Sequence, residues 1–170
     1  LVVLGGSQGA QSLNQWVKGN LENLSADGIS TYCITGMQNE SSGRVELLDE
    51  SGNSIVSSFV SFSDEMNVVI SSADVIVSRA GAGSLAEIVR CRVPSVMVPY
   101  PYAADDHQRL NARFLESKGG GVVCEDDVIE NELIREVREM MFNEELRSMI
   151  RQNLFAIDPG DVASKMVEDI

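Results

Sequence analysis

Residues 74–87 read Asp-Val-Ile-Val-Ser-Arg-Ala-Gly-Ala-Gly-Ser-Leu-Ala-Glu, and this stretch decides the class of fold. Its apolar run predicts a buried β-strand, and the two glycines that follow predict a turn into an α-helix. Pro94 keeps that helix from extending much beyond Arg92. A strand that enters a helix through a glycine turn is the unit from which parallel α/β sheets are built.

The same alternation of short apolar runs and longer amphipathic stretches continues along the chain. Six strands are predicted, at residues 1–4, 31–35, 55–60, 74–78, 95–98 and 121–124. Helices are expected at 9–24, 64–71, 79–92, 105–117 and from about 128 onward with a break at 158–160. The polar residues 36–52 predict a loop with a short helix around 45–48. We therefore expect an α/β protein with a Rossmann-like, doubly wound parallel sheet of about six strands, forming a single domain over residues 1–170.

Composition excludes several classes of function. The 170 residues carry a formal net charge of −13, which argues against binding to nucleic acid or to anionic lipid surfaces. No apolar run approaches the roughly 20 residues that span a bilayer. Cys33, Cys91 and Cys124 lack metal-ligand spacing, so we expect three reduced, buried thiols in a cytoplasmic protein and no metal site. Because the chain starts in mid-strand, we also expect that some sequence upstream of it has been removed.

Three polar segments follow predicted strands. The first, residues 5–9, reads Gly-Gly-Ser-Gln-Gly and precedes a helix, whose free N–H groups would suit an anion. The glycine spacing differs from the dinucleotide-binding fingerprint, and a tight turn with close helix–strand packing explains it equally well. The second segment contains Arg79, suited to a phosphate, and Glu87, suited to ribose hydroxyls. Taken alone, the spacing of Ser84 and Glu87 favours a capping box.

The third segment, residues 105–111, follows the strand at 95–98. His107 and Gln108 would present polar groups to a sugar. In the alternative interpretation, Asp105 or Asp106 caps the helix and His107 is merely exposed. Parallel strands end at one edge of the sheet, so all three segments would converge on one crevice. That arrangement suits a nucleotide with a polar group at its far end, without selecting the nucleotide.

Together these segments resemble the C-terminal domain of the MurG family of UDP-N-acetylglucosamine transferases. The matching residues lie in the family's order and spacing over about two-thirds of the chain: 5–10 with Leu13 and Asn14, 62–66, Arg79, 81–87, Pro99, 105–108, Asn111 and Ala112. The resemblance implies one half of a GT-B glycosyltransferase, in which two Rossmann-like domains face a cleft and the C-terminal one holds the donor.

The resemblance also implies roles for individual residues in binding UDP-N-acetylglucosamine. Ser7 would lie at the diphosphate, and the backbone at Ser63 would read the uracil with Met66 nearby. Arg79 would lie near the uracil and the nucleotide pocket. The turn made by Ala82, Gly83, Ser84, Leu85, Ala86 and Glu87 would meet the phosphates and ribose. Glu87 would bind the ribose hydroxyls in preference to capping the helix. His107 and Gln108 would contact the sugar.

The implied activity is an inverting N-acetylglucosaminyl transfer that converts lipid I to lipid II in peptidoglycan synthesis, with no cofactor and no essential metal. The undecaprenyl-linked muramyl-pentapeptide acceptor and the general base would belong to an N-terminal domain absent here, so His107 is not assigned as the base. We expect the chain alone to be inactive and the full-length enzyme to be peripheral on the cytoplasmic face of the plasma membrane.

Two alternatives of other kinds remain open at this point. A stand-alone UDP-N-acetylglucosamine-binding subunit would use the same residues and dock on a membrane partner. A fragment of a UDP-N-acetylglucosamine 2-epimerase would share the GT-B fold, but it would need acid/base carboxylates and histidines that the sequence does not place.

Overall fold

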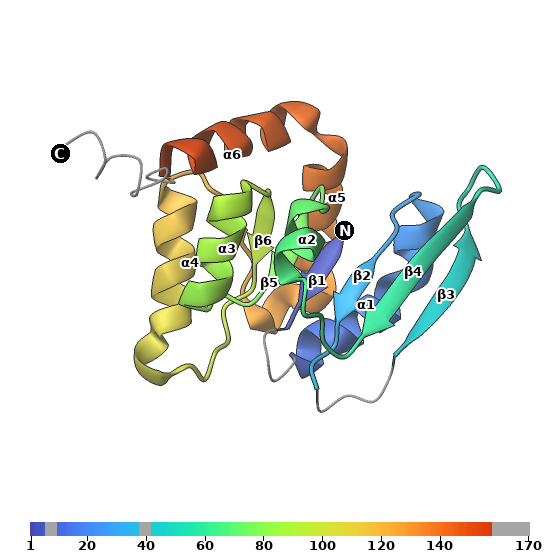
Figure 1. The fold of residues 1–170 in the computed structure, drawn as a ribbon, viewed down its shortest axis with the longest axis horizontal. Helices are drawn as coiled ribbons and strands as arrows, with labels where there is room; N and C mark the ends of the chain where they lie inside the picture. The colour runs from blue at the N-terminus through green and yellow to red at the C-terminus, as the bar shows by residue number, and fades with distance from the viewer. Residues whose placement is uncertain (6–9, 38–41, 158–170) are drawn as a thin grey trace.

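The computed structural model describes residues 1–5, 10–37 and 42–157. In this part of the chain, one seven-stranded mixed sheet has the order β3-β4-β2-β1-β5-β6-β7 (Figure 1). The strands are β1 (Val2–Leu4), β2 (Tyr32–Ile34), β3 (Gly43–Leu48), β4 (Ser54–Val60), β5 (Ile76–Ser78), β6 (Ser95–Met97) and β7 (Val122–Val123).

All strands except β3 run parallel to one another, and these six are the strands that the sequence predicts. Numbered along the chain, they lie in the order third, second, first, fourth, fifth, sixth. This is the strand order of Rossmann-type sheets, and the order reverses between β1 and β5. The predicted fold class is confirmed, and the reversal marks where such sheets bind ligands.

The expected short helix around residues 45–48 is wrong, because these residues belong to β3. They form an antiparallel hairpin with β4, with Val45 opposite Ser57 and Leu48 opposite Ser54. The turn is closed by Asp49, whose Oδ1 accepts hydrogen bonds from the backbone N–H groups of Ser51 and Asn53, each at 2.8 Å. β3 is largely exposed along its length, so its residues lack the alternating burial by which a strand is recognised in a sequence.

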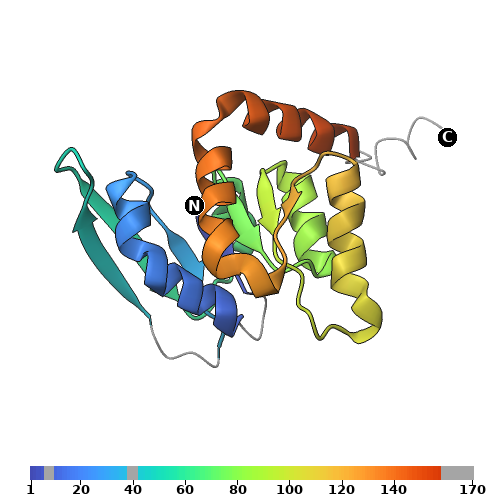
Figure 2. The ribbon, with the colours of Figure 1, turned by 180° about the vertical axis from the view of Figure 1, so that it is seen from behind.

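Helices cover both faces of the sheet. They are α1 (Gln11–Ala26), α2 (Met66–Ser71), α3 (Ala82–Cys91), α4 (His107–Ser117), α5 (Ile129–Phe142) and α6 (Glu144–Ile157), with short 3-10 turns η1 (Ala104–Asp106) and η2 (Asp126–Val128). In Figure 1, α2 and α3 lie toward the viewer with α4 beside α3, and Figure 2 shows α1 and α5 on the opposite face. α6 contacts both α3 and α5.

The core forms where these helices meet the sheet. On α1 the predicted apolar face is confirmed, because Leu13, Trp16 and Val17 are fully buried and Leu21 packs against them in part. The central strands β1, β5 and β6 are buried at every position, as expected for a parallel sheet with helices on both faces. No described helix is long and apolar enough to cross a membrane.

Replacing two glycines by alanine should change the free energy of unfolding in opposite directions. A methyl group at Gly121, just before β7, would lie 2.6 Å from the Ser95 carbonyl oxygen. We expect Gly121→Ala to lower the free energy of unfolding by about 1–3 kcal/mol, the usual cost of overpacking. Gly19 is exposed in α1 with open space around it, so Gly19→Ala should raise the same quantity by roughly 0.5–1 kcal/mol. Urea unfolding measures both changes, and an unaffected Gly121→Ala protein would contradict the close approach at β7.

Candidate functional site

The candidate site lies at the carboxyl edge of the sheet, where the connections after β1, β4, β5 and β6 come together. The first predicted segment falls partly outside the described residues, since Ser7 lies in the stretch 6–9. The described part shows α1 starting at Gln11, with Ala10 at the N-cap position and no side-chain cap. Ser12 therefore stands in the first turn of α1, facing the other connections.

The turn after β5 contradicts the capping-box alternative. α3 begins at Ala82 with Gly81 as its N-cap, in extended conformation and without a side-chain cap. Ser84 is the third residue of the helix, and Glu87 lies in its second turn, exposed to solvent. Ser84 and Glu87 are therefore too far into the helix to cap it. The Glu87 carboxylate is left available at the edge of the crevice.

A small pocket of about 180 Å³ brings several predicted residues together. Met66, Ser84 and Glu87 line it, from the starts of α2 and α3. Its other lining residues are Leu4, Ile34, Ser61 and Phe62. Leu4 and Ile34 are the buried last residues of β1 and β2, and they give the pocket an apolar base beside a carboxylate and a hydroxyl. Such a pocket can hold a flat ring on its apolar part and bind hydroxyl groups at its rim.

Ser63 lies beside this pocket without lining it. It follows Phe62 directly and is half-buried, and its hydroxyl oxygen accepts a hydrogen bond from the Glu65 backbone N–H at 3.2 Å. That bond orders the approach to α2 and thereby the position of Met66. The sequence did not assign Leu4, Ile34 or Ser61 to the site, although their places at or after strand ends were a usable signal.

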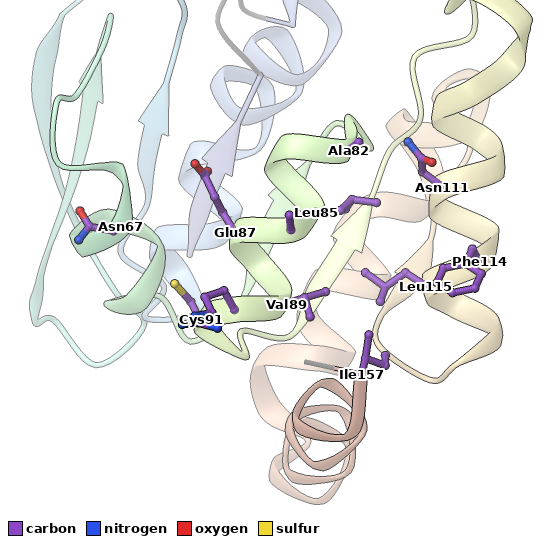
Figure 3. A pocket seen from close by; sticks show the side chains of 12 residues that line it. Asn67, Ala82, Leu85, Glu87, Val89, Cys91, Asn111, Phe114, Leu115 and Ile157 are labelled. Carbon is purple, nitrogen blue, oxygen red and sulfur yellow. The ribbon is translucent and has the colours of Figure 1, made fainter. Parts of the chain in front are cut away.

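A larger groove of about 710 Å³ runs along the outer side of α3 (Figure 3). Four predicted residues line it, namely Ala82, Leu85, Ala86 and Glu87. The rest of the lining comes from the second half of α3 and from α2, α4 and the end of α6: Val89, Arg90, Cys91, Asn67, Asn111, Phe114, Leu115 and Ile157. The smaller pocket has the larger polar share in its lining, so it is the better candidate for recognising a polar ligand.

Arg79 is buried among protein acceptors. Its Nη1 lies 2.6 Å from Asp126 Oδ1 and donates to the carbonyl oxygens of Val98 and Pro99, at 3.1 and 3.3 Å. Its Nη2 donates to the Ser12 hydroxyl at 2.7 Å. Only 8% of the residue is exposed. The sequence signalled Arg79 itself but gave no sign of its partner Asp126, which is 47 residues away.

The third predicted segment is only partly as expected. Asp106 holds the N-cap position of α4 without making a side-chain cap, and its carboxylate lies 3.3 Å from Arg109 Nη1. The capping role considered for Asp105 or Asp106 is therefore wrong. Both residues have positive φ angles, 51° and 54°, which are uncommon outside glycine. His107 is exposed, as that alternative expected, and its Nδ1 lies 2.6 Å from the Ala104 carbonyl oxygen.

Two amides fix α4 relative to the neighbouring turns. Gln108 Oε1 accepts a hydrogen bond from the Tyr100 backbone N–H at 3.0 Å. Asn111 Nδ2 donates to the Ala80 carbonyl oxygen at 3.2 Å, which joins α4 to the turn before α3. The second and third predicted segments are thus directly connected.

The thiols are free, as expected, but their burial differs. Cys33 and Cys124 are buried, and burial raises the pKa of each thiol to about 12. Cys91 is only half-buried, which corrects the expectation of three buried thiols. Burial and the nearby Glu87 carboxylate raise its pKa as well, so all three thiols stay protonated at neutral pH. Within the described residues, no group of three or more His, Cys, Asp or Glu side chains is arranged to hold a metal ion.

The comparison with known families agrees with this geometry. Residues 1–164 match the glycosyltransferase family 28 C-terminal domain. The chain belongs to this family. A curated family relative from Opitutus terrae, named UDP-N-acetylglucosamine–N-acetylmuramyl-(pentapeptide) pyrophosphoryl-undecaprenol N-acetylglucosamine transferase, is 44% identical over all 170 residues. The chain spans 45% of that relative's length, or about half of such proteins.

Solved structures show the same fold. MurG from Acinetobacter baumannii superimposes with a TM-score of 0.68 and 26% identity, over 89% of this chain and 44% of that one. The solution structure of ALG13 superimposes with a TM-score of 0.56 and 18% identity, over 84% of both chains. At that identity the ALG13 match shows the fold alone. The family 28 chain thus corresponds to one half of a GT-B glycosyltransferase, as the sequence implies.

Proposed function

We propose that this chain binds UDP-N-acetylglucosamine as the donor half of an inverting N-acetylglucosaminyltransferase that converts lipid I to lipid II in peptidoglycan synthesis. The observation that carries the proposal is the 44% identity, over the whole chain, to a relative whose name describes this transfer. The geometry at the carboxyl edge of the sheet supports it, because three of the predicted donor residues, Met66, Ser84 and Glu87, line one pocket there.

The uridine would occupy the small pocket. Its base would lie on the apolar part near Met66 and be read by the backbone at Ser63. The ribose would then reach Glu87, whose carboxylate is exposed and has no cap to make. A carboxylate accepts hydrogen bonds from two adjacent hydroxyl groups, which are the groups that a ribose presents.

The diphosphate would face the N-terminus of α3. Because Gly81 caps this helix without a side-chain hydrogen bond, the first backbone N–H groups are left for a ligand. Ala82 and Gly83 are both exposed, so the approach to these groups is open. The same N–H groups would stabilise the charge that develops on the leaving UDP during transfer.

The sugar would extend toward the start of α4. His107 Nδ1 lies against a carbonyl oxygen, which places the proton of the neutral ring on Nδ1 and leaves Nε2 to accept a hydrogen bond. Gln108 uses its Oε1 for the Tyr100 N–H, so its NH₂ group is left to donate. Together the two side chains offer one acceptor and one donor to sugar hydroxyls.

Transfer itself requires a second domain. The acceptor 4-hydroxyl must be held in line with the anomeric carbon, and positioning of this kind supplies roughly 7–11 kcal/mol of barrier lowering. We assign the undecaprenyl-linked acceptor, the general base and peripheral contact with the cytoplasmic face of the membrane to the half of the relatives that this chain does not match. The alternative of a stand-alone binding subunit is less well supported, because identity to ALG13 is 18%.

Ligand preference tests the donor assignment. The chain should bind UDP and UDP-N-acetylglucosamine more tightly than ADP or NAD, because the pocket beside Ser63 and Met66 suits a small pyrimidine. Isothermal titration calorimetry with the four ligands at one salt concentration gives the four dissociation constants. Binding of NAD as tight as that of UDP would contradict the proposal.

The role of Glu87 can be separated from helix stability. Glu87→Gln should weaken UDP binding by about 1.5–3 kcal/mol, the cost of losing a charge-assisted hydrogen bond. The melting temperature should stay within experimental error, because Glu87 does not cap α3. Glu22→Gln, at another exposed position in the body of a helix, is the matched control and should change neither quantity. Unchanged UDP affinity in Glu87→Gln would remove Glu87 from the ribose site.

Catalysis tests the two-domain requirement. The chain alone should transfer no labelled N-acetylglucosamine to a soluble lipid I analogue, and addition of the N-terminal half of a relative should restore transfer. A matched reaction with that half alone controls for background activity. Robust turnover by the isolated chain would show that the catalytic group lies within these residues, and His107 would be the first to replace.

A further inference from the structure

One side chain connects four segments at the carboxyl edge of the sheet. Arg79 directly follows β5, and its guanidinium donates to Ser12 in the first turn of α1 and to Asp126 at the start of η2. It also donates to the carbonyl oxygens of Val98 and Pro99 in the connection after β6. The guanidinium of Arg79 therefore links its own connection, after β5, to the connections that follow β1, β6 and β7.

The contacts form a closed arrangement. The Ser12 hydroxyl donates to Asp126 Oδ1 at 3.0 Å, so Ser12, Arg79 and Asp126 each contact the other two. The side chains of Arg79 and Asp126 are only 9% and 21% exposed. The Tyr100 ring lies on the remaining side, with its centroid 5.4 Å from Arg79 Cζ. A planar guanidinium can satisfy these acceptors at fixed angles, which a lysine ammonium cannot do.

Resting on the function proposed above, we propose that Asp126 is a positioning residue for the donor site and that Arg79 acts by holding the surrounding connections in place. The donors of Arg79 point at protein acceptors, so the diphosphate is bound by backbone groups that Arg79 and Asp126 keep in register. A buried ion pair adds little net stability, because desolvation offsets its attraction. Its effect here is on the relative positions of α1, α3 and the start of α4.

This role and direct phosphate contact predict opposite effects of one substitution. If Arg79 bound the phosphates directly, replacing Asp126 by a neutral residue would free the guanidinium and remove a negative charge, and UDP would bind more tightly. If Asp126 positions the connections, the same substitution weakens UDP binding although it removes a charge of the same sign as the ligand.

The experiment measures UDP affinity of Asp126→Asn by calorimetry, well below its melting temperature. We expect at least a tenfold rise in the dissociation constant. The matched control is Asp27→Asn, because Asp27 is 22% exposed and lies 2.6 Å from Arg138 Nε, at the far end of α1. That variant should lose thermal stability and keep the UDP affinity of the original chain. Unchanged or tighter binding by Asp126→Asn would overturn the proposal.

A milder variant keeps the test decisive if Asp126→Asn fails to fold. Ser12→Ala removes one arm of the arrangement and leaves the ion pair, so it should fold and bind UDP about threefold more weakly. Full UDP affinity in Ser12→Ala, with a lowered melting temperature, would show that the contacts serve stability alone. Absence of UDP binding in the original chain would instead refute the proposed function, so the two failures are distinguishable.

Discussion

The pairing of β1 with β5 is the interaction on which the rest of the structure depends. Val2 lies opposite Ile76 and Leu4 opposite Ser78, in the buried centre of the sheet. Because the two strands are parallel, the turns after them leave the sheet side by side, and the Arg79 N–H donates to the Leu4 carbonyl oxygen at 3.3 Å. The chain reverses its direction of winding at this pair, so helices that follow the two strands cover opposite faces and leave a crevice between their starts.

Under the proposed function, the crevice would bind an anion on a strongly acidic protein. With a net charge of −13, the long-range field of the chain repels a diphosphate. Two arginines near the crevice are already paired, since Arg109 and Arg113 both contact Glu125. Under that proposal, binding would come from short-range donors such as the backbone N–H groups at the start of α3, which has no side-chain cap. A glycine N-cap is suited to this task because it leaves the N–H groups without an internal acceptor.

The sequence predicted what depends on local pattern. The six parallel strands follow from apolar runs, and the turn at residues 79–87 follows from its glycines. The capping box that the local spacing suggested does not form, because a Ser-x-x-Glu spacing looks the same inside the first two turns of a helix as at its start. Asp126 could not be found, because nothing near it in the sequence refers to Arg79; the contact exists only once β5 and β7 stand two places apart in one sheet.

The sheet has two edge strands, β3 on one side and β7 on the other. Along β3, Arg44 and Glu46 are exposed, and charges on an outer strand hinder the addition of a further strand from another molecule. At the other margin β7 has two residues, and Glu116 Oε1 accepts the hydrogen bond of the Val123 N–H at 2.8 Å. The two edges are thus protected against sheet-to-sheet aggregation by different means, one by charged side chains that a further strand would have to desolvate and one by a carboxylate that occupies the free donor.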